Sequence, residues 1–280
     1  MTGGLPGPPD RAADSIVASI RERSTLVPTV GLVLGSGLGD ALGDDFTIET
    51  SIDYAELPPM PATTVPGHAG RLLLGAIAGV AVVAFEGRFH LYEGHDVHVP
   101  ALLPRVARAL GAPTIVLTAA VGAVVPGLAA GTVVVLRDHL NLMGAIPLTG
   151  WRFPDGSPAF VNATAVYDAD LRRLTLERAT ELGIDATEGV YGAMRGPAYE
   201  TPAEIEMLSR LGATVVGMSM VPESLPAHAL GMRVLGICSL TNALGDHVTH
   251  EDVLRVSSRT AADIGRLLVD LMPRLPSEGA

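Results

Sequence analysis

Residues 86–94 carry three side chains that could bind an anion together. They read Glu-Gly-Arg-Phe-His-Leu-Tyr-Glu-Gly, and on an extended backbone Arg88, His90 and Tyr92 would share one face. An Arg fork beside a His donor suits phosphate or a carboxylate, and an adjacent Tyr suits a sugar or a ring. The apolar run 80–85 just before them predicts a buried strand, whose exit is a common place for ligand-binding groups. The alternative is a solvated edge strand with one polar face.

A second candidate anion site is the turn at residues 35–39, Gly-Ser-Gly-Leu-Gly, which follows the apolar run 30–34. A glycine-rich strand exit lets the backbone approach an anion closely, and Ser36 adds a hydroxyl donor. The dinucleotide fingerprint G-x-G-x-x-G fails here because Asp40 stands at its last position. An anion turn is therefore favoured over a Rossmann site, and a purely structural turn is the alternative.

Ser219 lies in Gly217-Met218-Ser219-Met220-Val221, which is similar to the nucleophile elbow G-x-S-x-G. Val221 replaces the closing glycine, and a β-branched residue suits that strained turn poorly. We therefore expect Ser219 to donate a hydrogen bond to an anion and not to act as a nucleophile.

The remaining polar candidates point to a heterocycle and not to a metal. The spacing of His68, His90, His95 and His98 matches no zinc motif. Glu200 precedes a capping-box sequence, and Asn242 ends an apolar run, so each could act as a helix or strand cap or could bind a polar ring; His250, at a predicted helix start, should be neutral.

These residues must converge if the sheet is parallel. Carboxyl ends of parallel strands meet at one edge, and polar residues follow the predicted strands there: Ser36, Arg88, His90, Ser219 and Asn242. The sequence predicts one crevice with an anion-binding half and, at Glu200 and Asn242, a heterocycle-binding half.

Short β-branched runs alternate with amphipathic stretches, the pattern of an α/β domain with a central mixed, largely parallel sheet flanked by helices. Strands are expected at 30–34, 72–76, 80–85, 114–118, 132–136, 189–194, 215–218 and 234–240. Helices are expected at 10–23, 99–110, 168–182, 202–211, 222–230 and 250–272. Residues 1–9 are expected to form a loose tail, 10–275 a single domain, and 144–163 a long surface loop.

Composition narrows the chemistry. The 280 residues are 48% hydrophobic, enough for a sizeable core, and a formal charge of −11 argues against a nucleic-acid partner. All 19 basic residues are arginine, which excludes P-loop and Schiff-base lysines. Cys238 is alone and lies in an apolar run, as expected for a structural thiol. No apolar stretch reaches membrane-span length and no signal peptide is evident, so we expect a cytoplasmic protein with no membrane partner.

The motifs together resemble the purine nucleoside phosphorylases of the trimeric, 6-oxopurine-preferring type. Six motifs occur in family order: Gly35-Ser36-Gly37-Leu38-Gly39, Val65-Pro66-Gly67-His68-Ala69-Gly70, Gly87 to Gly94, Gly196-Pro197-Ala198-Tyr199-Glu200-Thr201, Val216-Gly217-Met218-Ser219 and Thr241-Asn242. The resemblance implies phosphorolysis of inosine or guanosine, and of their 2'-deoxy forms, to a free purine and (deoxy)ribose 1-phosphate in purine salvage. It implies a homotrimer, with phosphate as co-substrate and no cofactor.

By the same resemblance each site residue acquires a role. Phosphate would be held by Ser36, His68, Arg88, His90, Ser219 and the backbone of Ala120. The nucleoside would contact Tyr92, Met218, Tyr199, Glu200, Asn242, His250 and, from a neighbouring subunit, Phe160. Asn242 would donate to purine N7 as the base leaves, with Glu200 and His90 as the other catalytic residues.

The chain departs from the family pattern at two places. Residues 118–123 read Thr-Ala-Ala-Val-Gly-Ala where the family usually has Thr-Asn-Ala-Ala-Gly-Gly, so Val121 is expected to crowd the pocket floor, and Met220 stands where Thr or Ser is common. Related methylthioadenosine phosphorylases carry Asp in place of Asn242, so Asn242 and the triplet Tyr199-Glu200-Thr201 favour 6-oxopurines. A methylthioadenosine or methylthioinosine phosphorylase is the alternative. A non-catalytic nucleoside-binding protein and a Rossmann oxidoreductase are more distant alternatives.

Overall fold

The computed structural model describes residues 4–39, 41–246 and 249–275. Its strands are β1 (Val30–Leu34), β2 (Phe46–Asp53), β3 (Arg71–Ile77), β4 (Val80–Glu86), β5 (Thr114–Ala123), β6 (Val133–Asn141), β7 (Ala186–Ala193), β8 (Val215–Gly217) and β9 (Arg233–Asn242). Its helices are α1 (Ala12–Arg21), α2 (Leu102–Leu110), α3 (Ala169–Glu181), α4 (Pro202–Arg210), α5 (Val221–Ala229) and α6 (His250–Leu271). None of the helices in these ranges is long and apolar enough to cross a membrane.

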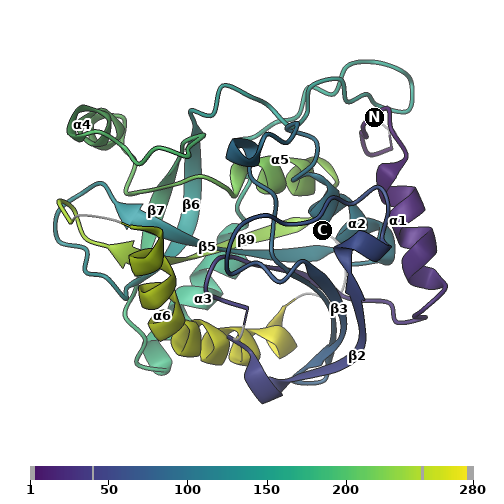
Figure 1. Cartoon of the computed structure of the whole chain (residues 1–280), viewed down its shortest axis with the longest axis horizontal. Helices are drawn as coiled ribbons and strands as arrows, with labels where there is room; N and C mark the ends of the chain where they lie inside the picture. Colours follow the sequence, from purple (N-terminus) through teal and green to yellow (C-terminus); the bar gives the residue numbers. More distant parts are fainter. Residues whose placement is uncertain (1–3, 40, 247–248, 276–280) are drawn as a thin grey trace.

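All the described strands belong to one mixed sheet, as predicted (Figure 1). Their order is β2-β3-β4-β1-β5-β8-β7-β6-β9, and β9 returns to pair with β5, so the last part of the sheet closes on itself. The strands β4, β1, β5 and β9 are mutually parallel, which directs their carboxyl ends toward the same edge.

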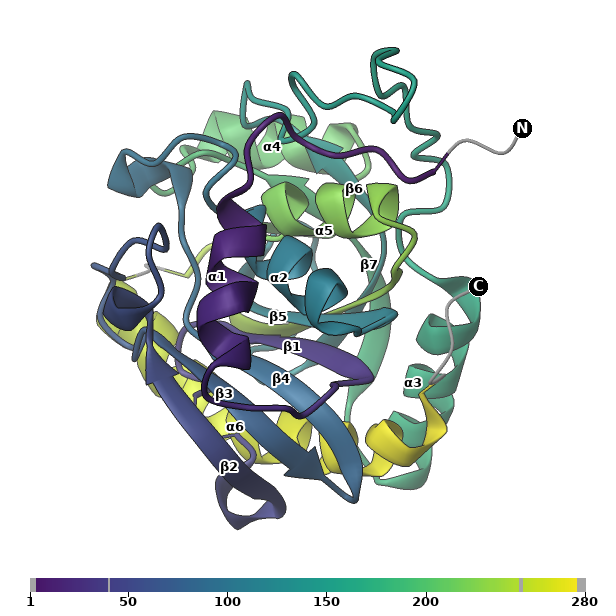
Figure 2. The same ribbon diagram turned by 90° about the vertical axis from the view of Figure 1, so that its right-hand side faces the viewer.

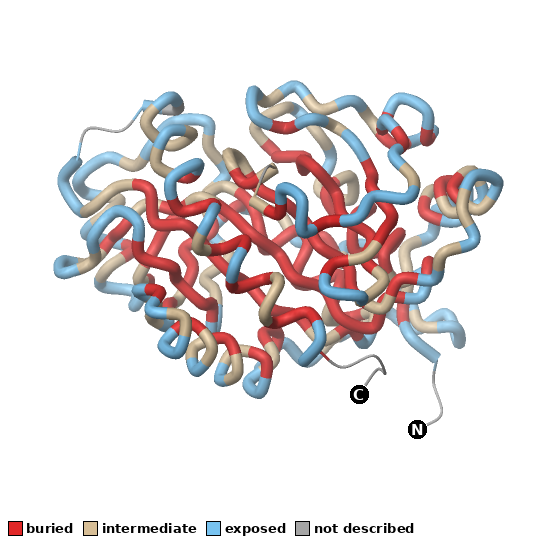
Figure 3. The backbone as a smooth tube through the Cα atoms, turned by 90° about the horizontal axis from the view of Figure 1, so that it is seen from below, coloured by how far each residue is buried: buried red, intermediate tan, exposed pale blue. Residues whose placement is uncertain are grey.

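Helices cover the sheet from two sides. Helices α1, α2 and α5 pack together against one face, while α3 and α6 cover the other (Figure 2). Each side buries its own apolar cluster, and the buried chain runs through the middle of the molecule in Figure 3. This two-sided cover explains why the central strands are apolar runs without alternation.

Local sequence signals place helix starts correctly. The capping box predicted at Thr201 is confirmed: the Glu204 amide donates to Thr201 Oγ1 at 3.3 Å, and the Thr201 amide donates to Glu204 Oε2 at 2.7 Å. Thr249 caps α6 by accepting a hydrogen bond from the Asp252 amide at 3.1 Å.

Several elements differ from the sequence-based expectation. β2 was not predicted, because it is an edge strand with mostly exposed polar residues and an irregularity between Ile48 and Thr50 that breaks alternation. β5 continues five residues past the predicted end at Thr118, to Ala123. Helix α2 starts at Leu102 and not at residue 99.

The N-terminal segment is attached to the long loop. Gly7 and Arg152 exchange two backbone hydrogen bonds of 2.9 Å, and Pro6 is buried, so the expectation of a loose tail is wrong for these residues. The loop itself is confirmed to lack helices and strands over 144–163, and it is anchored by Trp151, which is only 2% exposed.

A two-residue turn joins β3 to β4 and places a non-glycine residue at positive φ. Ile77 pairs with Val80, and the turn residues Ala78 and Gly79 have φ of +48° and +80°. Such turns favour Asn-Gly, because Asn tolerates positive φ better than Ala.

We therefore expect Ala78→Asn to raise the free energy of unfolding by about 0.5–1 kcal/mol, because Ala78 is exposed and only its backbone strain changes. Urea unfolding of both proteins measures the difference. Ala78→Val is the matched control and should destabilise the protein, since a β-branched residue suits positive φ least. Equal or lower stability of the Asn variant would contradict the strain argument.

Candidate active site

One cavity of about 620 Å³ lies at the edge where the parallel strands end. This volume is within the usual range for small-molecule sites. The cavity brings together most of the residues that the sequence singled out: Ser36, Arg88, His90, Tyr92, Ala120, Tyr199, Glu200, Met218, Ser219 and Asn242. Val121 also lines it, as expected from its place beside Ala120.

The strand ends reach this cavity from two directions. Ser36 follows β1 and Arg88 follows β4, and Asn242 is the last residue of β9. Ser219 differs from the expectation, because β8 runs antiparallel to the end of β5 and enters the site from the opposite side. This approach is possible because β5 extends to Ala123 and pairs there with β8.

The segment after β4 is not the extended strand that was predicted. It turns into a short 3-10 helix, Leu91–Glu93, which ends the alternation. Arg88, His90 and Tyr92 still line the cavity together, because the His90 and Tyr92 rings stack at 4.6 Å with an interplanar angle of 15°. The backbone stays extended as far as His90, with φ −119° and ψ 151°, and ring stacking then adds Tyr92 to the shared face.

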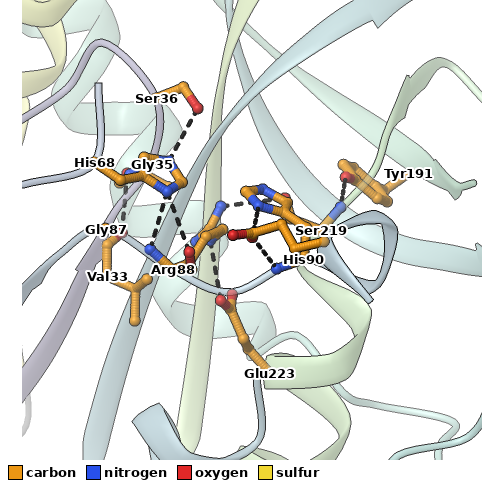
Figure 4. A network of polar contacts seen from close by, with 12 residues as sticks. Val33, Gly35, Ser36, His68, Gly87, Arg88, His90, Tyr191, Ser219 and Glu223 are labelled. Atoms are coloured by element: carbon orange, nitrogen blue, oxygen red, sulfur yellow. Dashed lines mark hydrogen bonds and ion pairs between the residues drawn. The ribbon is translucent and has the colours of Figure 1, made fainter. Parts of the chain in front are cut away.

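Arg88 is the central cation of the site, and its side chain is 1% exposed (Figure 4). Its Nε donates to Glu223 Oε1 at 3.0 Å, and its Nη1 donates to Ser219 Oγ at 3.2 Å. Its Nη2 is buried and has no hydrogen-bond partner among the described residues. Nη1 keeps a second N–H beside Ser219, which lines the cavity, so the guanidinium is suited to an anionic ligand.

His90 is oriented by Glu93, three residues later. Glu93 Oε1 accepts from the His90 amide at 2.7 Å and lies 3.0 Å from His90 Nδ1. Burial opposes ionisation of Glu93, but hydrogen bonds from His90 and Thr64 outweigh it and lower the pKa of Glu93 to about 2. Burial lowers the pKa of His90, so the ring is neutral, carries its proton at Nδ1 toward the carboxylate, and leaves Nε2 for a ligand.

His68 lies behind the cavity wall. Its Nε2 is 3.0 Å from Ser36 Oγ, its Nδ1 lies near the backbone of Arg88, and its ring stacks on His90 at 5.3 Å (Figure 4). Burial, and then the nearby His90 and Arg88, lower the pKa of His68 to about 3. The described contacts make His68 a partner of the Ser36 hydroxyl; its direct contact with phosphate stays a prediction.

Ser219 sits on a strained turn. Met220 has φ +65° and ψ −55°, and the Val221 amide donates to the Ser219 carbonyl at 2.8 Å, which defines a γ-turn with positive φ. The Ser219 amide donates to the Tyr191 hydroxyl at 3.0 Å. The contacts found for the Ser219 side chain run to Arg88 and not to a histidine base, which favours the predicted anion-binding role over nucleophilic catalysis.

Tyr199, Glu200 and Asn242 form the other end of the cavity. Burial raises the pKa of the Glu200 carboxyl, while Tyr199 remains 45% exposed. Thr241 Oγ1 lies 3.0 Å from Asn242 Oδ1, so the amide oxygen has a partner and Nδ2 is left to donate into the cavity. A Cβ on Gly122 would lie 2.9 Å from Asn242 Nδ2, so this close approach requires glycine.

Besides His68, one predicted residue lies outside the cavity, and the side chain of another lies outside the described residues. Phe160 is 90% exposed on the long loop and does not line the site of its own chain. His250 is the first residue of α6, but its side chain lies outside the described part of the structure. Among the described residues, no group of three or more His, Cys, Asp or Glu could hold a metal ion.

Sequence reasoning missed the residues that support the cavity wall. Glu93 could have been found from its spacing to His90, because the pair forms a capping box. Glu223 and Tyr191 carried no local signal, since their partners Arg88 and Ser219 are 135 and 28 residues away in the sequence.

The low pKa of His68 predicts acid sensitivity. Unfolded His68 takes up a proton near its ordinary pKa of 6.5, whereas the folded protein resists protonation until about pH 3. Stability from this group is present above pH 6.5 and is lost as the pH falls toward 3, by about 2 kcal/mol between pH 7 and pH 5. His68→Gln can keep the Ser36 contact. Between pH 7 and pH 5 its free energy of unfolding, measured in urea, should fall by about 2 kcal/mol less than that of the wild type. His228→Gln, outside the cavity, is the control, and an equal pH response in all three proteins would contradict the assignment.

Comparison with known proteins identifies the family. A sequence profile of the Phosphorylase superfamily matches residues 29–273. Purine nucleoside phosphorylase 1 of Bacillus subtilis (strain 168) is 40% identical over 263 residues, covering 92% of this chain and 95% of that protein. Purine nucleoside phosphorylase of Bos taurus is 38% identical over 266 residues, covering 90% and 91%.

Solved structures of similar proteins support the same family. A schistosoma purine nucleoside phosphorylase in complex with hypoxanthine is 32% identical, with a TM-score of 0.86 over 94% of this chain and 97% of that one. Isoform 2 from Schistosoma mansoni, in complex with cytosine and ribose-1-phosphate, is 34% identical, with a TM-score of 0.87 over 95% and 97%. The fold, the order of the motifs and these relatives lead to one conclusion: the chain belongs to the purine nucleoside phosphorylases of the phosphorylase superfamily.

Proposed function

We propose that this enzyme cleaves inosine, guanosine and their 2'-deoxy forms with inorganic phosphate, and releases the free purine and (deoxy)ribose 1-phosphate for purine salvage. The observation that carries the proposal is the polarity of the cavity. One end has the Arg88 guanidinium with the Ser36 and Ser219 hydroxyls, and the other has an amide and a carboxyl at Asn242 and Glu200. An anion and a polar heterocycle joined through a sugar match these two ends.

The phosphate end would hold the nucleophile. Arg88 Nη1 has a second N–H to donate, His90 has Nε2 available, and the hydroxyls of Ser36 and Ser219 line the same wall. The Ala120 backbone, which lines the cavity from inside β5, would add a further donor. His68 would act on phosphate directly or through Ser36, which it contacts.

The sugar would lie between the two ends, against Tyr92 and Met218. Gly196 packs so closely on these side chains that a Cβ there would overlap Met218 Sδ and lie 3.2 Å from Tyr92 Cδ1. This contact keeps both side chains in the cavity wall. His250, at the start of α6, would reach the 5'-hydroxyl.

The purine would stack on Tyr199, with Glu200 accepting from a ring N–H and Asn242 Nδ2 donating to N7. Phosphorolysis breaks the bond between C1' and the purine nitrogen, whose electrons go to the base, while a phosphate oxygen forms the new bond to C1'. The Asn242 hydrogen bond strengthens as charge develops on the leaving base, and positioning of phosphate beneath the sugar supplies much of the rate. No cofactor is needed, because phosphate is the nucleophile.

The exposed Phe160 supports a proposed homotrimer. A phenylalanine at 90% exposure has its apolar surface in water, and we propose that it enters the cavity of a neighbouring subunit. We also propose that the enzyme acts in the cytoplasm on small molecules, without nucleic-acid or membrane partners.

A nucleoside panel tests the proposed function. With phosphate, the protein should release hypoxanthine from inosine and guanine from guanosine, and it should act much more slowly on methylthioadenosine and methylthioinosine. Without phosphate there should be no turnover, and arsenate should replace phosphate as the nucleophile. Faster release from the methylthio nucleosides would instead assign the alternative substrate, and binding without ribose 1-phosphate formation would assign a non-catalytic role.

Asn242→Asp tests the base end. The carboxylate cannot donate to N7, so kcat for inosine should fall by about 10²-fold while the KM for phosphate changes little. The kcat for a 6-amino nucleoside should fall less, because the carboxylate can accept a hydrogen bond from the amino group. Steady-state kinetics on inosine and adenosine measure both effects, with Asn162→Asp on the long loop as the control. An unchanged kcat for inosine would contradict the role of Asn242.

A further inference from the structure

Arg88 and Glu223 form a buried ion pair that no sequence motif predicted. Their side chains are 1% and 2% exposed, and Arg88 Nε donates to Glu223 Oε1 at 3.0 Å. Two atoms of the pair, Arg88 Nη2 and Glu223 Oε2, are buried without a partner among the described residues. The pair is therefore joined through one nitrogen and one carboxylate oxygen, while the second carboxylate oxygen and one terminal nitrogen have no partner among the described residues.

The carboxylate lies on the far side of Arg88 from the cavity. Arg88 lines the cavity and Glu223 does not, so Glu223 cannot touch a ligand there without replacing the guanidinium (Figure 4). Its contact is with Nε, while Nη1 donates to Ser219 Oγ, and Ser219 lines the cavity. Glu223 thus holds the base of the guanidinium and fixes the direction of its outer nitrogens.

The strained turn at Met220 positions both residues that accept hydrogen bonds from Arg88. Ser219 precedes Met220 and accepts from Arg88 Nη1, while Glu223 is in the first turn of α5, where its amide donates to the Met220 carbonyl at 3.1 Å. One turn therefore supplies a hydroxyl and a carboxylate to two nitrogens of the same guanidinium. Nη1 carries a second N–H, so beside Ser219 the guanidinium can still donate to another acceptor.

Glu223 also offsets the positive charge of the phosphate end. Arg88 is the only arginine among the described residues that line the cavity, and its neighbours His68 and His90 are neutral because burial lowers their pKa values. A phosphate bound to the Arg88 guanidinium would be a second anion on a cation that already has one. The two anions must then oppose each other across Arg88.

We propose that Glu223 is a positioning residue that aims Arg88 at phosphate and, by its charge, weakens phosphate binding so that phosphate and ribose 1-phosphate can dissociate. This inference rests on the proposed function. It separates two contributions: the contact orients the guanidinium and favours binding, while the charge opposes binding.

Glu223→Gln removes the charge and keeps an oxygen to accept from Arg88 Nε. Without its counter-charge, Arg88 gains more from phosphate, so the KM for phosphate should fall by about three- to tenfold. The KM for inosine should stay within about twofold, because the coupling is local to Arg88. The melting temperature without phosphate should fall, and the increase caused by saturating inorganic phosphate should be larger than in the wild type.

Glu223→Asp provides the opposite change and keeps both buried charges, so it guards against a variant that fails to fold. The shorter side chain should draw Arg88 away from the cavity and raise the KM for phosphate. Asp168→Asn, which alters the Arg233–Asp168 pair (2.6 Å) outside the cavity, should lower the melting temperature without changing the response to phosphate.

A KM for phosphate that is unchanged or raised in Glu223→Gln would overturn the charge effect, and an unchanged or lowered KM in Glu223→Asp would overturn the orienting effect. If Glu223→Gln does not fold, the Asp variant still decides the orienting role, and thermal shifts of wild type and Glu223→Asp with phosphate replace the kinetic comparison. Absence of phosphate-dependent turnover in the wild type would instead refute the proposed function. That result is obtained without the Glu223 variants, so the two failures can be told apart.

Discussion

The burial of one guanidinium constrains the rest of this structure. Arg88 lies at the exit of a central strand, where its charge is removed from water and must be compensated by the protein. Glu223 supplies the opposite charge, Ser219 accepts one hydrogen bond from Nη1, and a second Nη1–H remains available. Two segments distant in sequence therefore meet at Arg88, and the same demand for compensation that brings them together also creates a position for an anion.

The cavity wall depends on supports that do not enter the cavity. Glu93 orients His90, His68 contacts the Ser36 hydroxyl, and the Tyr191 hydroxyl accepts from the Ser219 amide. Because both histidines are buried and neutral, they serve as hydrogen-bonding groups and not as cations. The site thus combines a single, partly offset positive charge with an array of oriented neutral groups, an arrangement suited to binding an anion and releasing it again.

Close backbone approach and local strain are concentrated at the same place. Met220 adopts positive φ where the chain passes from β8 to α5, and this turn carries Ser219. Gly122 leaves room for the Asn242 amide, which a Cβ would displace. The departure Val121 also lines the cavity, so the floor differs from the family pattern without closing the site.

By itself the sequence determined the fold class, most strands, the helix caps and the residue types that line the cavity. These features depend on local patterns: apolar runs, capping boxes and motifs in family order. The expected convergence at strand ends held for Ser36, Arg88 and Asn242, because parallel neighbours must direct their carboxyl ends to one edge.

Only the tertiary structure decided how these residues are oriented and charged. It reversed β8 relative to β5, replaced the expected extended backbone at Tyr92 with a short helix and a ring stack on His90, and tied Gly7 to the long loop. It also paired Arg88 with Glu223 across 135 residues. The physical reason is that burial, and the compensation it requires, depend on which distant segments meet, and residue spacing along the chain carries no record of that.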